Sequence, residues 1–214
     1  MGFIENTMFE IKVSNSVNNQ TQNVAGKFGT GTGSTFAAAD CSAGLLCVTN
    51  GLLPVEGYES FTEQGGAYRF LNGNTYYFNA ATNGNSGGRY GDHTGIYACN
   101  TYDVQKLGSG DQIYNLGAKT LGLGVPAGYR SDFTEIIIGE QYTFGKGNFS
   151  TAPTTGSKFA TIANGLLVAA ASAPAAGSGV YFEIKRSYNE TEGASDAGTV
   201  YVLKALRTLE AAAA

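Results

Sequence analysis

The sequence predicts a mostly β protein: an antiparallel β-sandwich or barrel with long Gly- and Asn-rich loops and at most one short helix. Two observations predict this class. Short apolar runs recur along the chain and are separated by Gly and Asn, which favour turns, and glycine fills 31 of the 214 positions. Before residue 35, no window repeats apolar residues at i, i+3, i+4 and i+7, the pattern of an amphipathic helix.

The first 34 residues are expected to form an extended or mobile arm. A strand pattern at 9–13 is followed by a polar, Asn-rich run and then by a Gly-rich run. Residues 35–208 then form the β-rich body, and a division into two lobes near residue 150 stays open. Residues 209–214, Leu-Glu followed by four alanines, are typical of an expression-tag remnant and are left out of the fold prediction.

One Asn-Gly dipeptide is the clearest turn signal, and a second copy of its pattern occurs later in the chain. Asn50-Gly51 lies between two apolar runs, and Asn164-Gly165 precedes a Leu-Leu pair just as Asn50-Gly51 does. Asn-Gly between apolar runs favours a two-residue hairpin turn. The shared Asn-Gly-Leu-Leu indicates either a structural duplication or chance. A further turn at 72–74 is expected between the aromatic runs 68–71 and 75–78.

The remaining elements are also short strands. We expect them at 96–99, 112–116, 133–138 and 141–144, with a final antiparallel pair at 180–185 and 199–204. One helix candidate is the Ala-rich stretch 160–173, because alanine has the highest helix propensity, although Gly165 and Pro174 limit it.

The composition argues against nucleic-acid and membrane partners. Charged residues make up 14% of the chain, and the formal net charge is −4, whereas contact with a phosphate backbone needs clustered Lys and Arg. The longest weakly polar stretch, 166–176, is shorter than the ~20 residues of a spanning helix. The start of the chain lacks the pattern of a secretory signal peptide. We therefore expect synthesis in a reducing cytoplasm.

The residues that could bind a metal or form disulfides are few. Cys41, Cys47 and Cys99 are an odd number without metal-ligand spacing, so free, buried thiols are expected, and a Cys41–Cys47 or Cys47–Cys99 bridge stays open. The only histidine, His93, has Asp92 alone as a nearby acidic residue and is expected to be a solvated loop side chain. No metal or cofactor is predicted.

One motif resembles a catalytic one. Gly84-Asn-Ser-Gly-Gly88 matches the nucleophile elbow G-x-S-x-G, but no helical pattern follows it. A Ser86–His93–Asp92 triad would also lie in one loop without separate rigid supports. We therefore predict no catalytic residues and no enzyme.

Aromatic side chains offer a different kind of site. The candidate surface-binding aromatics are Tyr76, Tyr77 and Tyr90, with packing in a core or interface as the alternative.

Several stretches resemble small virion proteins encoded beside the major capsid gene of tailed bacteriophages and prophages. They share short apolar-Gly phrases at 43–58, 96–104, 121–128 and 144–149. The resemblance implies a capsid decoration, or cement, protein that is β-rich, has no catalytic residues and is located in the virion. It also implies binding to the major capsid protein or another virion protein, and a homo-oligomer, with a trimer favoured. The residues leave a second interpretation open, a receptor- or carbohydrate-binding adhesin module of a phage tail or cell surface.

Overall fold

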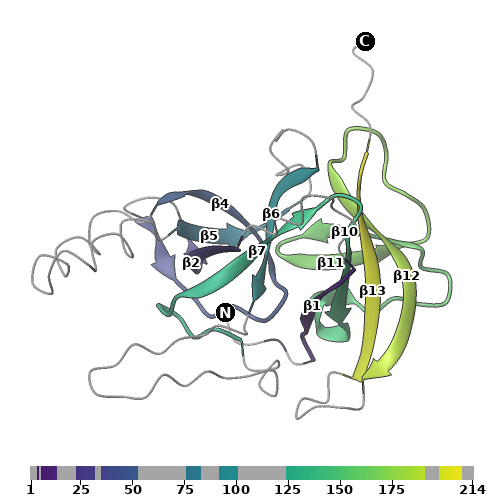
Figure 1. Cartoon of the computed structure of the whole chain (residues 1–214), viewed down its shortest axis with the longest axis horizontal. Coiled ribbons are helices and arrows are strands. Elements are labelled where there is room, and N and C mark those ends of the chain that lie inside the picture. The colour runs from purple at the N-terminus through teal and green to yellow at the C-terminus, as the bar shows by residue number, and fades with distance from the viewer. Residues whose placement is uncertain are drawn as a thin grey trace, which may run out of the picture.

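The computed structural model describes residues 4, 6–13, 23–31, 35–52, 76–82, 92–100, 124–190 and 198–208. These residues form two β-sheets that lie side by side (Figure 1). The described residues contain no α-helix. A short 3-10 helix, η3 (Lys146–Asn148), follows β8. The mostly β class predicted from the sequence, with a barrel, is confirmed.

The first sheet closes into a barrel. Its strands are β2 (Asn23–Thr30), β4 (Leu46–Leu52), β5 (Tyr76–Ala80), β6 (His93–Asn100) and β7 (Ser131–Ile137), with the short β3 (Ala37–Ala38) beside β2. The order is β3-β2-β5-β4-β6-β7, and an additional β2–β7 pairing completes the ring. β2 and β5 are parallel, and the other barrel pairs are antiparallel. Closure leaves the barrel strands without the exposed edges of an open sheet.

The second sheet, called the C-terminal sheet below, has seven strands in the order β1-β8-β13-β12-β10-β11-β9. Their bounds are β1 (Phe9–Val13), β8 (Gln141–Gly145), β9 (Phe149–Thr151), β10 (Phe159–Ala163), β11 (Leu166–Ala170), β12 (Val180–Glu190) and β13 (Gly198–Arg207). β12 and β13 form a long antiparallel ladder, which confirms the expected final pair.

The two sheets share one apolar core, and the barrel has another of its own. Successive strand residues point to opposite faces, so in β6 Ile96 and Ala98 face the C-terminal sheet while Tyr97 and Cys99 face the barrel interior. Inside the barrel, the ring of Phe78 stacks on the ring of Phe133, and the two ring centroids are 3.9 Å apart. The inter-sheet core joins side chains of β4, β6 and β7 to those of β1, β8, β10, β11, β12 and β13.

Residues 4, 6–13 and 23–31 are part of this body, whereas the sequence predicted an extended or mobile arm over 1–34. The backbone N–H of Ile4 donates to Ser42 Oγ (2.8 Å), and that of Met8 donates to Asn148 Oδ1 (3.0 Å). β1 pairs with β8, and Phe9 is buried in the inter-sheet core. Within 1–34, β2 is likewise a barrel strand. These strands are extended, as expected, but they belong to the two sheets.

The two Asn-Gly dipeptides have different structures. Asn164 and Gly165 have φ of 49° and 80° and form the turn between β10 and β11, inside the stretch for which the sequence predicted a helix. Asn50-Gly51 is instead inside β4, where the register with β5 shifts between Thr49 and Gly51. A shifted register is the mark of a bulge, so the predicted turn at this position is wrong. The shared Asn-Gly-Leu-Leu is therefore no structural duplication.

The helix expected at 160–173 is also wrong, because the hairpin β10–β11 occupies most of that stretch. Ala160 and Ile162 are buried while Thr161 is partly exposed, which is the alternation of a strand. Tertiary packing outweighs the helix propensity of alanine here.

The chain passes from the barrel to the C-terminal sheet in the turn at 138–140, rather than near 150. The expected strands at 68–71 and 112–116 and the turn at 72–74 lie outside the described residues.

Candidate functional site

A histidine–carboxylate pair lies where the barrel meets the C-terminal sheet. His93 Nδ1 is 2.9 Å from Glu135 Oε2, and the side chains are 42% and 0% exposed, respectively. Glu135 lies two residues after Phe133, whose ring is inside the barrel, so strand alternation directs it to the same side. The other carboxylate oxygen, Oε1, accepts a hydrogen bond from the N–H of Gly95 (2.9 Å).

This geometry corrects the expectation that His93 is a solvated loop residue. His93 is the first residue of β6, and the carboxylate that meets it comes from the neighbouring strand β7. In the sequence, the acidic residue next to His93 is Asp92, but the Asp92 side chain is exposed. Because partners in a sheet come from distant parts of the chain, spacing along the sequence could not identify Glu135.

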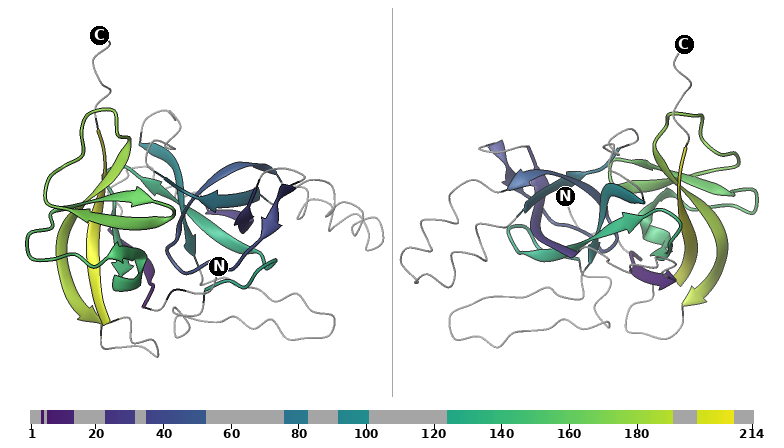
Figure 2. Two further views of the ribbon diagram at one scale, coloured as in Figure 1. Left: turned by 180° about the vertical axis from the view of Figure 1, so that it is seen from behind. Right: turned by 45° about the horizontal axis from the view of Figure 1, so that its top comes forward.

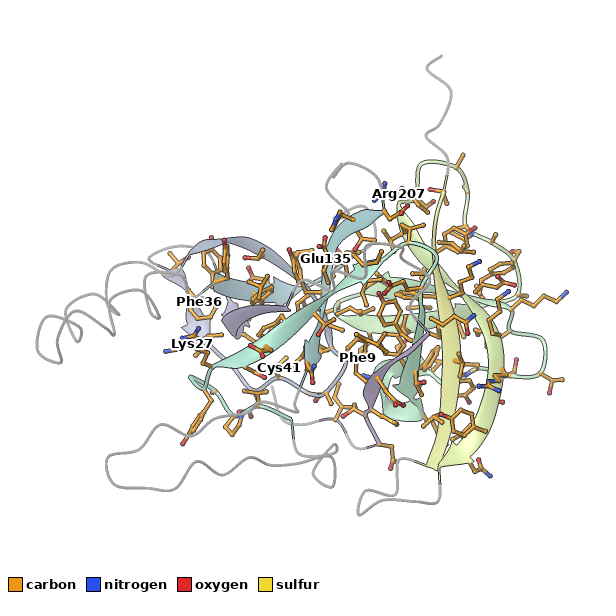
Figure 3. All side chains as sticks on the ribbon, viewed as in Figure 1. Phe9, Lys27, Phe36, Cys41, Glu135 and Arg207 are labelled. Atoms are coloured by element: carbon orange, nitrogen blue, oxygen red, sulfur yellow. The ribbon has the colours of Figure 1, made fainter. Side chains whose placement is uncertain are left out.

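The pair is also tied to the C-terminal sheet. Arg207, near the end of β13, donates from Nη2 to the carbonyl oxygen of His93 (2.6 Å). Figure 3 places Glu135 and Arg207 on the upper side of the junction between the sheets. β6, β7 and β13 are therefore connected by polar contacts at this point.

A second buried carboxylate lies in the turn that joins the sheets. Tyr142 Oη is 3.1 Å from Glu140 Oε2 and accepts a hydrogen bond from the N–H of Ile137 (2.8 Å). Burial raises the pKa of Tyr142 well above its usual range; the Ile137 hydrogen bond opposes this shift, and the nearby charge of Glu140 adds to it. The phenol therefore stays protonated and connects both ends of the turn.

The polar groups of the described residues limit the chemistry that this site could support. An imidazole oriented by a buried carboxylate could act as a general base. No group of three or more His, Cys, Asp or Glu side chains able to hold a metal occurs in the part of the chain that the structure describes. The elbow residue Ser86 lies outside that part.

The three cysteines meet inside the barrel as free, buried thiols, as expected. Burial raises the pKa of the Cys41 and Cys47 thiols. A hydrogen bond with Cys41, together with burial, raises the pKa of the Cys99 thiol. Because the thiolate is the reactive form, these groups behave as small apolar side chains.

The predicted surface aromatics do not gather into a site. Tyr77 is buried with its ring against Phe36, so it is a core residue, and Tyr76 is partly buried beside the barrel interior. Tyr90 lies outside the described residues. Among the large apolar side chains of the described residues, Tyr129 is the exposed one, with 37% of its surface accessible. It lies in a turn that is closed by a hydrogen bond from its own N–H to the Pro126 carbonyl. The preceding Pro-Ala-Gly was a turn signal in the sequence that pointed to this position.

A stretch with a single charged side chain forms the outer strands and loops of the C-terminal sheet. Residues 147–182 hold a single charged side chain, that of Lys158. Two connections in this stretch, 152–158 and 171–179, consist almost entirely of Ala, Ser, Thr, Pro and Gly, and most of their residues are exposed. Both lie on the side of the sheet away from the barrel (Figure 2), and we call them the distal loops. This run was visible in the sequence, but the sequence did not show that both loops extend from the same end of the hairpin β10–β11.

Comparison with family models, curated proteins and solved structures gives no match for this chain. None of the helical segments in the described residues is long and apolar enough to span a bilayer.

Proposed function

We propose that this protein is a non-enzymatic virion structural protein that binds the outside of a bacteriophage capsid as a decoration, or cement, protein. The observation that supports this is the combination of a β-body built on one shared core with exposed loops that carry almost no charge. The centres of protein–protein interfaces are likewise depleted of charged residues.

The architecture suits a protein that works through contact area. The strands β2, β5, β4, β6 and β7 close into a ring, and the inter-sheet core holds both sheets in one body. A preformed body loses little conformational freedom when it binds, so a larger share of the contact energy contributes to affinity. The partner is the major capsid protein or another virion protein, and the protein itself is a homo-oligomer, with a trimer favoured.

Co-sedimentation tests this function. The purified chain is mixed with undecorated capsids assembled from the major capsid protein of the phage or prophage that would encode it, and its solution mass is measured in parallel. We expect saturable pelleting with capsids and an oligomeric mass. A protein that remains in the supernatant at every capsid concentration would contradict the proposal.

One observation favours a second candidate, a carbohydrate-binding adhesin. Tyr129 presents a partly exposed ring on a tight turn, and aromatic rings with one apolar face and a polar tip are suited to stacking on sugars. Binding to a glycan array that is lost in Tyr129→Ala, without binding to capsids, would favour this candidate over the first.

A further inference from the structure

We propose that the distal loops are the surface that contacts the capsid, and that the capsid surface they meet is an uncharged protein face. This inference rests on the proposed function and specifies its interface. It also orients the protein, with the C-terminal sheet toward the lattice and the barrel away from it.

The distribution of charge selects the surface. Charged residues are 14% of the chain, yet residues 147–182 contain only Lys158. A charged partner pressed against this stretch would lose water without gaining an opposite charge, which is unfavourable. An uncharged protein face meets no such cost, whereas DNA, RNA or an anionic membrane would need clustered Lys and Arg.

The distal loops already have a defined conformation. In the first, the N–H of Ser157 donates to the Thr154 carbonyl (2.9 Å), and the N–H of Thr154 donates to Ser157 Oγ (3.0 Å). In the second, the N–H of Ser178 donates to the Ala175 carbonyl (3.2 Å). Ala, Gly and Pro lose no rotamer entropy on burial, so the loops can be covered at a small entropic cost.

The hairpin β10–β11 explains why these loops point away from the barrel. At its turn, the N–H of Leu46 donates to the Gly165 carbonyl (2.9 Å), and the N–H of Gly165 donates to the Ala81 carbonyl (2.7 Å). The turn is therefore fixed to the barrel. The open end, from which both distal loops extend, lies a strand length further out, as Figure 2 shows.

Charge insertion at exposed positions tests the inference. The substitutions Ala173→Glu and Ala173→Lys place either charge on a distal loop, and Ala37→Glu and Ala37→Lys place the same charges on exposed β3 of the barrel. The probe is the undecorated capsid, and circular dichroism with a thermal midpoint checks that each variant is folded. We expect both Ala173 variants to bind about tenfold more weakly or worse, because each would bury an unpaired charge. Both Ala37 variants should bind like the parent protein.

The possible outcomes separate the inference from the function. If the parent protein binds capsids and the Ala173 variants bind equally well, the distal loops are not the interface, although the function stands. If one charge weakens binding and the other strengthens it, the partner face is charged and the inference fails. If the parent protein does not bind capsids, the proposed function fails, and the inference fails with it. Affinity of the parent protein should also change little between 0.1 M and 1 M salt, over which exposed charges become screened.

Discussion

At the scale of single residues, Asn148 connects three segments that are distant in sequence. Its Oδ1 accepts hydrogen bonds from the N–H groups of Met8 and Gly145 (3.0 Å each), and its Nδ2 donates to the Ala43 carbonyl (2.7 Å). Asn148 is buried, so these hydrogen bonds lie in the protein interior.

We predict that Asn148→Ala lowers the free energy of unfolding by about 2–4 kcal/mol, because the N–H of Met8 and the carbonyl of Ala43 lose the hydrogen bonds that Asn148 makes with them in the protein interior. Urea denaturation followed by circular dichroism measures the change. Asn189→Ala is the matched control, since Asn189 is exposed, and it should change stability by less than about 0.5 kcal/mol. Equal stability of the two variants would contradict the prediction.

The buried thiols give the protein a predictable response to alkaline pH. Burial raises the pKa of Cys41 above the ordinary value of 9.0, and the thiols of Cys47 and Cys99 shift in the same direction. Above about pH 9 the unfolded chain releases these protons while the folded chain retains them. Stability is therefore complete below this pH and falls as the pH rises, by up to about 1.4 kcal/mol per pH unit for each thiol.

Urea midpoints between pH 7 and 10.5, measured with a reductant present, check this response. Cys41→Ala should be less stable than the parent protein at pH 7, because it leaves a small cavity. Its stability should nevertheless fall less steeply above pH 9. Parallel pH profiles of the two proteins would show that the thiols are not responsible.

At the scale of elements, the β10–β11 turn fits closely against the barrel. Gly165 has φ of 80°, and a Cβ there would lie 2.9 Å from Leu45 Cδ1. We predict that Gly165→Ala costs about 2–4 kcal/mol through backbone strain and the clash with Leu45. Gly156→Ala is the control, because nothing lies within 4 Å of its Cβ. It should be neutral or stabilising by up to about 1 kcal/mol. Thermal unfolding of both variants measures the difference.

The sequence predicted strands best where apolar residues are flanked by clear turn signals. β1 was predicted with its observed bounds, and β8, β12 and β13 within a few residues. It failed where tertiary contacts decide the structure. The Ala-rich stretch at 160–173 has high helix propensity, yet it forms a hairpin whose turn bonds to Leu46 and Ala81. Asn50-Gly51 has the residues of a turn, but the pairing of β4 with β5 resumes at Gly51 and continues the strand through it.

The candidate site shows the same limit. The free thiols were predictable, because their number and spacing fit neither a metal site nor a disulfide framework. The partner of His93 was not, because Glu135 is brought to it by the pairing of β6 with β7. The burial of Tyr77 was equally hidden, since its neighbour Tyr76 has the same residue type and a different environment.

At the scale of the whole molecule, the inter-sheet core determines how the protein unfolds. Phe9 stacks on Tyr142 with ring centroids 5.7 Å apart, and it belongs to the same core as Ile96 and Ile136 of the barrel. A cavity at Phe9 therefore weakens contacts on both sheets. We predict that Phe9→Ala costs about 3–5 kcal/mol and that removal of residues 1–13 prevents stable folding.

Hydrogen exchange measured by mass spectrometry can show whether both sheets respond together. In Phe9→Ala, peptides from β4 and β6 should lose as much protection as peptides from β12 and β13, because segments that unfold in one global step share its free energy. Phe159→Ala is the control, since this ring is partly exposed on the outer face of β10 and lies outside the inter-sheet core. It should leave protection in the barrel strands largely unchanged. Loss of protection confined to the C-terminal sheet in Phe9→Ala would mean that the barrel and this sheet fold independently, and the first residues would then serve the C-terminal sheet alone.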